Sequence, residues 1–215
     1  ARKGVVLCYG GFSADVKFRQ MHDPKLTDKF STTNQPGATS EMWRETSAIG
    51  ALQVQNDWIQ CGPWGCPREK GMGIGWQFNQ TAAAEYGLWV NAEGKRFVNE
   101  LETRDNVSAA ELAQEGGYAY TILDQKMMDA SSTYNGYFTK GYAVQADSYE
   151  ALAEKLGIDP ATFAATVETW NKAVADQKDD EFGRLSFASA LDTAPYYAIK
   201  VSPGIHHTMG GVKIN

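Results

Sequence analysis

The stretch WVNAEGKRFVNELETRDN, Trp89–Asn106, decides the fold that is expected of this chain. Residues 88–90 are Leu-Trp-Val, an apolar run with the length of a short buried strand. Glu93-Gly94 is typical of a hairpin turn, because glycine readily adopts the positive φ that such turns need. The sequence therefore predicts a strand, a turn and a return strand over residues 95–99.

A helix is predicted directly after this hairpin. Asp105 is a good N-cap residue, and residues 107–115 are rich in helix formers and are followed by two glycines. Arg104 then lies at the positive end of the helix dipole, which disfavours a cation by some tenths of a kcal/mol. Two explanations stay open from the residues alone. Arg104 is either an exposed arginine paired with Glu100 or Glu102, or it is held there for a function.

Composition limits the class of protein. Hydrophobic residues make up 43% of the 215 and aromatic residues 12%, which suffices for a packed core in one large or two small domains. The net charge of −6 argues against nucleic acid as a partner. No apolar run approaches the about 18 residues of a membrane span. The chain starts and ends on predicted strands, which we interpret as a piece of a longer protein.

The cysteines give no metal signature. Four residues separate Cys61 from Cys66, and no second pair of ligands lies nearby in the sequence. The two cysteines form a disulfide if the parent protein is exported, or they stay reduced in a loop, so the localisation stays open. Cys8 lies in the apolar run 4–8, which predicts a strand buried on both faces of a parallel sheet. Cys8 is therefore expected to be a small buried hydrophobe.

Two helices are predicted after this run. Gly10-Gly11 first allows a sharp turn and the close approach of another backbone or a ligand. Residues 13–21 then predict a short helix that Asp23-Pro24 ends. A second helix is predicted over residues 40–49, and we expect it to pack on the sheet through Ala38, Met42, Thr46 and Ile49.

The second half of the chain alternates strands and helices. Its capped amphipathic segments predict helices, and the apolar segments between turn residues predict strands. The expected elements are a strand at 118–123, a helix at 124–130, a loop with three tyrosines at 131–142, helices at 148–156 and 160–174, a charged solvated loop at 172–184, and a strand at 195–201. His206 and His207 follow; adjacent side chains of a strand point to opposite faces, so we expect no shared metal.

Four motifs occur in one order along the chain: Lys3–Phe12 (KGVVLCYGGF), Asn34–Thr39 (NQPGAT), Gly94–Glu100 (GKRFVNE) with Thr103-Arg-Asp105, and Pro203–Val212 (PGIHHTMGGV). Together they resemble the fumarate reductase/succinate dehydrogenase flavoprotein family. The resemblance is nearest to the soluble flavocytochrome type and to its urocanate and enoate reductase relatives, and it covers nearly the whole chain.

The resemblance implies a mixed α/β (α+β) fold in three parts. Residues 1–57 would be part of an FAD-binding, Rossmann-like domain, residues 58–193 a substrate-capping domain of small sheets and helices, and residues 194–215 return strands of the FAD domain. The Gly-x-Gly-x-x-Gly unit of a dinucleotide-binding domain does not occur in this sequence.

The resemblance also implies residue roles. Arg104 matches the arginine that donates a proton to the substrate in the family, and His206 would help to hold the substrate. The positions expected near FAD are Gly10, Gly11, Asn34, Thr39, His207 and Thr208.

The region from Trp58 to Gly87 departs from the family. Relatives carry a His-Pro pair where this chain has Gly62-Pro63, and a Thr-Glu-Ala-x-Arg-Gly segment where this chain has residues 79–87 without an arginine. The chain therefore lacks the residues that bind a substrate carboxylate in relatives, and it lacks their Glu/Arg proton relay. The same region is rich in tryptophan instead. The expected substrate-facing positions here are Gly62, Trp64, Trp76, Gln80 and Thr81.

We therefore expect a bacterial FAD-dependent reductase of activated alkenes that acts on an enoate and is served by an electron donor such as a haem or FMN domain. One alternative is a 3-ketosteroid dehydrogenase, although those relatives place a tyrosine where Arg104 stands and lack the His-His pair. Another is a binding module that has lost its chemistry, since the relay is missing.

Overall fold

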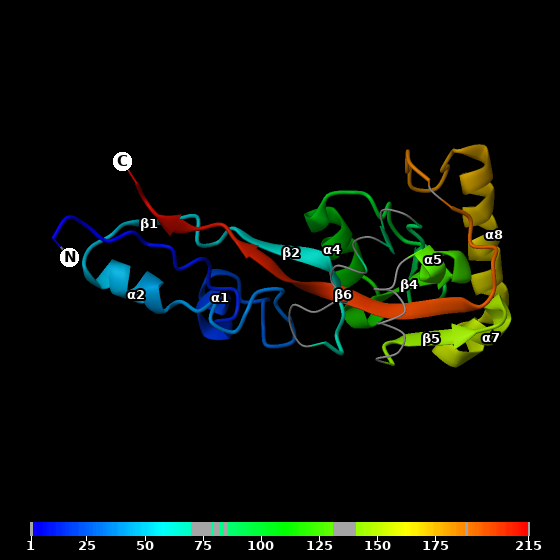
Figure 1. Ribbon diagram of the computed structural model, residues 1–215, viewed down its shortest axis with the longest axis horizontal. Helices are drawn as coiled ribbons and strands as arrows, with labels where there is room; N and C mark the ends of the chain where they lie inside the picture. The colour runs from blue at the N-terminus through cyan, green and yellow to red at the C-terminus, as the bar shows by residue number, and fades with distance from the viewer. Residues whose placement is uncertain are drawn as a thin grey trace.

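The computed structural model describes residues 2–69, 79, 82, 83, 86–130, 141–187 and 189–214. The chain is elongated, with its two ends close together and most helices at the opposite end (Figure 1). The elements are α1 (Val16–His22), α2 (Glu41–Ala48), β1 (Gln53–Val54), β2 (Ile59–Gly65), β3 (Trp89–Val90), α4 (Arg104–Leu112), η1 (Glu115–Gly117), β4 (Ala119–Asp124), α5 (Gln125–Ala130), β5 (Ala143–Ala146), α7 (Tyr149–Leu156), α8 (Pro160–Asp176), β6 (Tyr196–Thr208) and β7 (Gly211–Val212).

Strand β6 organises the described part of the molecule. It is 13 residues long and pairs with β4 and β5 in its first half and with β2 in its second half. The five-stranded sheet has the order β2-β6-β4-β3, with β5 also on β6, and its pairs are antiparallel. Figure 1 shows the β2–β6 ribbon joining the two ends of the molecule.

The main core lies at the helical end. Helices α7 and α8 pack on each other and against the sheet, and the inner face of α8 buries Phe163, Val167 and Trp170, as the spacing predicts. Helix α7 is capped at both ends: Ser148 accepts a hydrogen bond from Ala151 N, and Gly157 has a left-handed conformation (φ 73°). None of the described helices is long and apolar enough to cross a membrane.

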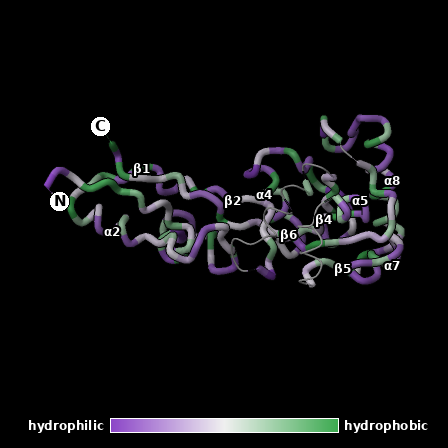
Figure 2. Tube along the Cα trace, viewed as in Figure 1, coloured by the Kyte–Doolittle hydropathy of each residue, from purple (hydrophilic) through white to green (hydrophobic). Residues whose placement is uncertain are grey.

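The apolar run at residues 4–8 is not a strand in this structure. Val5 and Val6 are 75% and 87% exposed, and Cys8 is exposed as well. Figure 2 shows this hydrophobic stretch along the N-terminal end of the trace. A buried parallel strand needs neighbours on both sides, and no described strand lies beside this run. The prediction of a parallel sheet with a buried Cys8 is therefore wrong for the described chain.

Two local predictions around Arg104 are corrected. The turn at Gly94 forms (φ 80°), but residues 95–99 make no strand, because Arg96 and Glu100 turn inward to ion pairs instead. The helix begins at Arg104, and its N-cap is Thr103, whose hydroxyl accepts from Asn106 N. Asp105 lies inside the first turn.

Two further predictions are corrected. Helix α2 buries Trp43 and Thr46, whereas Met42 and Ile49 are exposed, so its packed face is rotated from the expected one. Residues 172–176 belong to α8, and the following loop is not simply solvated, because Asp179 and Arg184 are buried. Most of the predicted tyrosine loop, 131–142, lies outside the described residues.

Candidate functional site

Arg104 is held by an aromatic ring rather than by a carboxylate. Its guanidinium carbon lies 5.2 Å from the centre of the Trp64 ring, a cation–π distance. Among the described residues it makes no ion pair, because Glu100 is engaged elsewhere and Glu102 accepts from Asn106. Arg104 therefore does not form the salt bridge to Glu100 or Glu102 that was one of the two explanations.

A buried ion-pair network fixes the segment that leads to Arg104. Arg96 donates to both carboxylate oxygens of Glu100, at 2.8 and 2.9 Å, and its third nitrogen lies 2.8 Å from Asp179. Arg184 approaches Glu100 at 3.4 Å. Burial works to lower the pKa of Arg96, but its bonds to Glu100 and Asp179 raise it overall. The network is stacked on Trp170 of α8, so it ties residues 96–100 to the helical core.

A β-bulge brings the two histidines together. Gln60 of β2 pairs with His207 while Cys61 pairs with Ile205, so His206 is the extra residue on β6. Bulges re-aim side chains. The two imidazole rings lie 3.9 Å apart, centre to centre, and do not point to opposite faces as a regular strand predicts. No group of three or more metal-ligating side chains occurs in the described part of the chain.

His206 is electrically neutral near pH 7. Burial, His207 and the positive charge of Arg104 together lower its pKa to about 4. Its Nδ1 lies 2.8 Å from the hydroxyl of Thr33, a partner that the sequence analysis did not single out. Arg104, Trp64 and His206 therefore form one neighbourhood at the junction of α4, β2 and β6.

The N-terminal loops meet the same end of β6. Asn34 donates through its amide to the carbonyl of His206 at 2.8 Å, and Thr208 accepts through its hydroxyl from Phe12 N at 3.0 Å. A Cβ on Gly11 would lie 2.0 Å from the Thr208 hydroxyl, so this close approach requires glycine. Gly10 has φ 70° and open space around it.

The remaining predicted positions are less informative. Gly62 is buried in β2 opposite Gly204, and Thr39 is half-buried. Trp76, Gln80 and Thr81 lie outside the described residues. Cys61 and Cys66 are free thiols, and burial, with a contribution from Asp105, raises the pKa of Cys61 to about 11.

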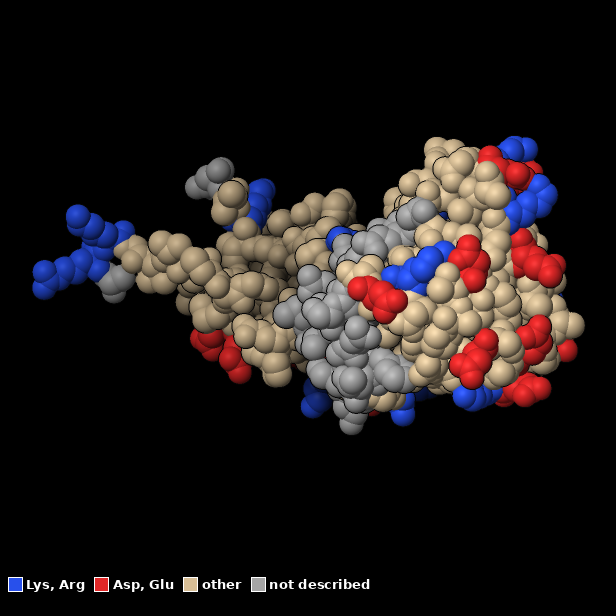
Figure 3. Space-filling view, turned by 45° about the vertical axis from the view of Figure 1, so that its right-hand side comes forward, with Lys and Arg blue, Asp and Glu red and all other residues tan. Residues whose placement is uncertain are grey.

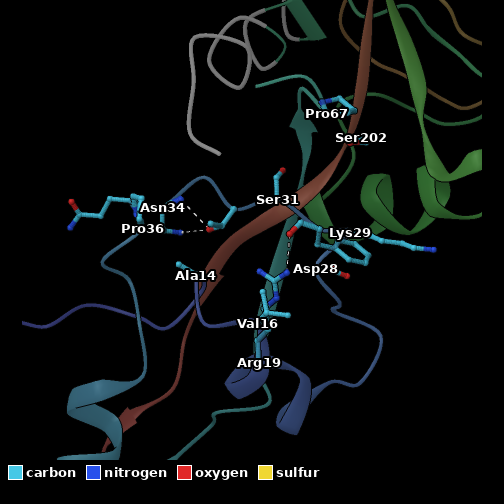
Figure 4. Close-up of a pocket in the computed structure, with 13 residues that line it drawn as sticks. Ala14, Val16, Arg19, Asp28, Lys29, Ser31, Asn34, Pro36, Pro67 and Ser202 are labelled. Atoms are coloured by element: carbon cyan, nitrogen blue, oxygen red, sulfur yellow. Dashed lines mark hydrogen bonds between the residues drawn. The ribbon is translucent and has the colours of Figure 1, made fainter. Parts of the chain in front are cut away.

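A cleft of about 840 Å³ lies beside this site (Figure 4). Loop residues 28–36 form much of its lining, and Asn34 belongs to both the cleft and the histidine neighbourhood. Arg19 also lines the cleft, but its guanidinium donates to the carbonyls of Ser13, Leu26, Thr27 and Phe30. Arg19 therefore orders the loop and is not available to a ligand. Neither Arg104 nor His206 is among the described residues that line this cleft.

One buried acid was not singled out by the sequence analysis. Glu111 of α4 is fully buried, and burial raises its pKa well above the usual value. Its position seven residues after Arg104, on the same face of a helix, is the only sequence signal that points to it.

The comparisons with known proteins identify the family of the chain. The model of the FAD binding domain family matches residues 1–215. The chain belongs to this family. It is 39% identical over 214 residues to NADH:fumarate oxidoreductase of Klebsiella pneumoniae (99% of this chain, 22% of that protein), and 31% identical over 220 residues to urocanate reductase of Eggerthella lenta (99% and 36%).

Among solved structures, the chain matches the open conformation of a flavocytochrome c3 fumarate reductase, with a TM-score of 0.81, 34% identity and coverage of 99% of this chain and 37% of that one. The predicted mixed fold and the cofactor FAD are confirmed, and the similar proteins are named as oxidoreductases and reductases. The chain spans only 22% to 37% of the length of these three proteins.

Proposed function

We propose that this chain is the substrate-binding part of an FAD-dependent reductase that reduces the C=C bond of an enoate. The observation that carries the proposal is the state of Arg104. Its charge is fixed over Trp64, is not neutralised by a described carboxylate, and lies next to a neutral histidine. A cation without an anion in a half-buried site is suited to bind an anionic substrate.

Arg104 serves as both anion binder and proton donor. FAD, when bound, supplies the hydride to the β-carbon of the enoate. The charge that then develops at the α-carbon is stabilised by the guanidinium, which delivers a proton there. An arginine side chain holds its proton very tightly, so it acts as an acid only where it is fixed in a water-poor site against a developing carbanion.

His206 contributes a hydrogen bond that orients the substrate, and it does not contribute a positive charge. Because its imidazole is neutral near pH 7 and is held by Thr33, it offers a fixed hydrogen bond to a carboxylate or carbonyl oxygen. The only full positive charge of the Arg104, Trp64 and His206 neighbourhood is therefore that of Arg104, which suits a substrate with one carboxylate.

FAD would contact the end of β6. We infer that Gly10, Gly11, Asn34, Thr39, His207 and Thr208 line the flavin ring, because open backbone at Gly10 and the exposed His207 leave room for a flat ring beside His206. These residues fit the ring of FAD but not its pyrophosphate, since no glycine-rich phosphate loop is present in the chain.

The far end of the substrate should be apolar. Gly62 has no side chain to bind a second carboxylate where relatives carry a histidine, and Trp64 offers flat apolar surface, whose stacking is worth about 0.5–1.5 kcal/mol beyond burial. A second carboxylate left unpaired there would cost several kcal/mol. Fumarate is therefore expected to be a poor substrate, and an enoate with an aromatic group a good one.

The experiment is a competition on the full-length parent protein. With a reduced low-potential dye as electron donor, kcat/KM is measured for fumarate and for cinnamate-like acids. We expect a preference for the aromatic acids. A clear preference for fumarate would mean that residues outside this chain rebuild a second carboxylate site, and no turnover of any enoate would favour the binding-module alternative.

The electron donor is proposed to be a haem or FMN domain or protein. A flavocytochrome among the solved relatives supports this partner. The charge distribution does not identify its docking face, because acidic and basic side chains are interspersed over the helical end in the view of Figure 3.

A further inference from the structure

Glu111 is a titratable group that the proposed mechanism does not use. It is fully buried on α4, and neither of its carboxylate oxygens has a hydrogen-bond partner among the described residues. Burial raises its pKa well above the usual range, because the charged form is disfavoured away from water, and this favours the protonated carboxyl. A buried carboxyl without partners destabilises the fold, and such groups next to a site are candidates for a function.

Glu111 lies in a row with Arg104. Residues 104, 108 and 111 share one face of α4, because positions three and four apart are neighbours on a helix. The middle member, Ser108, is also buried, and its hydroxyl likewise has no partner among the described residues. Helix α4 packs with β2 and β6, so the row faces the sheet that carries Trp64 and His206.

The proposed reaction requires a source of protons for Arg104. Once Arg104 has protonated a substrate carbanion, its guanidine is neutral and must recover a proton before the next turnover. The family resemblance places a Glu/Arg relay behind the arginine, but this chain has no arginine between Arg68 and Arg96. A different proton source is therefore required.

We propose that Glu111 returns the proton to Arg104 through the hydroxyl of Ser108. This inference rests on the proposed function. The carboxyl of Glu111 gives its proton to Ser108 as Ser108 gives its own to Arg104, and the Glu111 carboxylate then takes a proton from solvent. No two of these three side chains are in hydrogen-bond contact, so a bridging water or a rotamer change completes each transfer.

The surroundings of Glu111 suit a proton store. Its titratable neighbour on β2 is Cys61, whose thiol is neutral because burial raises its pKa to about 11. A cleft of about 330 Å³ begins at the next residue of the helix, where Leu112, Gly116 and Tyr118 are among its lining residues. Water in this cleft is therefore adjacent in sequence to the far end of the row, although Glu111 itself does not line the cleft.

The test uses Glu111→Gln in the full-length parent, with the exposed Glu115→Gln as the matched control. We expect Glu111→Gln to lower kcat for enoate reduction about tenfold or more and to change its solvent isotope effect, as loss of a proton donor does. Reduction of the flavin by the electron donor should be unchanged. Glu111→Asp should recover part of the rate, and Glu115→Gln should behave as the unchanged protein.

A second readout does not depend on activity. The infrared band of a protonated carboxyl, measured at neutral pH, should be present in the unchanged protein and in Glu115→Gln, and absent from Glu111→Gln. Its absence from the unchanged protein would overturn the relay. An unchanged kcat and isotope effect in Glu111→Gln, together with an inactive Arg104→Lys, would overturn the relay and leave the proposed function standing. An active Arg104→Lys would overturn both.

Discussion

At the scale of single residues, the partner of Arg104 determines what the arginine can bind. A cation–π contact is worth about 0.5–2 kcal/mol, whereas a buried ion pair resists separation by several kcal/mol. The contact with Trp64 therefore orients the guanidinium without neutralising its charge. A substrate carboxylate can then compete for Arg104, which it could not do against a buried glutamate.

Glu111 makes the stability of the chain depend on pH. Its folded-state pKa is raised above the unfolded value, so above about pH 4.5 the unfolded state loses a proton that the folded state keeps. Stability should therefore fall by about 1.4 kcal/mol per pH unit as the pH rises through this window, until the folded-state pKa is passed.

Glu111→Gln removes this dependence. We expect the variant to be more stable than the unchanged chain at pH 7, with a difference that vanishes as the pH falls to 4.5. Urea unfolding at several pH values checks this, with Glu115→Gln as the control. A variant that is less stable at pH 7 would show that the Glu111 carboxyl has a stabilising partner.

At single residues, the sequence motifs named side chains that the structure brings together, whereas contacts set by tertiary packing were not predicted. Arg104 and His206 were singled out by resemblance, and the structure brings them together with Trp64. The contact of His206 with Thr33 joins residues 173 apart in sequence. The burial of Glu111 depends on which face of α4 meets the sheet, and the local sequence does not state that.

At the scale of elements, the ion-pair network is what holds the approach to α4 in place. Glu100 accepts from Arg96 and from Trp89 N, and lies 3.4 Å from Arg184. We expect Glu100→Gln to destabilise the chain by about 3–5 kcal/mol, because a carboxylate shared by two buried guanidinium groups is lost and Arg96 keeps only its pair with Asp179. Urea unfolding measures the change.

The control for this prediction is Glu93→Gln. Glu93 forms an exposed pair with Lys95, so its loss should change stability by no more than about 0.5 kcal/mol. Equal effects of the two substitutions would show that the network around Glu100 contributes no more than a surface pair.

Helices were easier to predict than strands and bulges. Capping residues and 3.6-residue spacing are local signals, and they located α1, α5, α7 and α8 to within a few residues. The return strand at 95–99 failed because inward ion pairs competed with strand pairing. The bulge at His206 arises from the register between β2 and β6. These strands are more than 130 residues apart in the sequence, so no local sequence pattern predicts the bulge.

At the scale of the whole molecule, we expect the chain to supply one edge of a flavin site at the end of β6. The exposed apolar run at residues 4–8 and the short β1–β7 pair lie at the same end as both termini (Figure 1). The domain boundaries at 57/58 and 193/194 stay a prediction. Because the phosphate loop is missing, the isolated chain should not hold FAD tightly. Flavin absorbance after gel filtration tests this, and a yellow preparation with stoichiometric flavin would contradict it.

The central claim is that Arg104 is the proton donor for an enoate, and turnover of Arg104→Lys in the full-length parent tests it most directly. Lysine keeps the charge but lacks the planar fork, so it cannot both bind the substrate anion and align the proton. We predict that nearly all enoate turnover is lost, while folding and flavin reduction by the donor are unchanged. Retention of about a tenth or more of the activity would contradict the account, because Arg104 would then not be the donor.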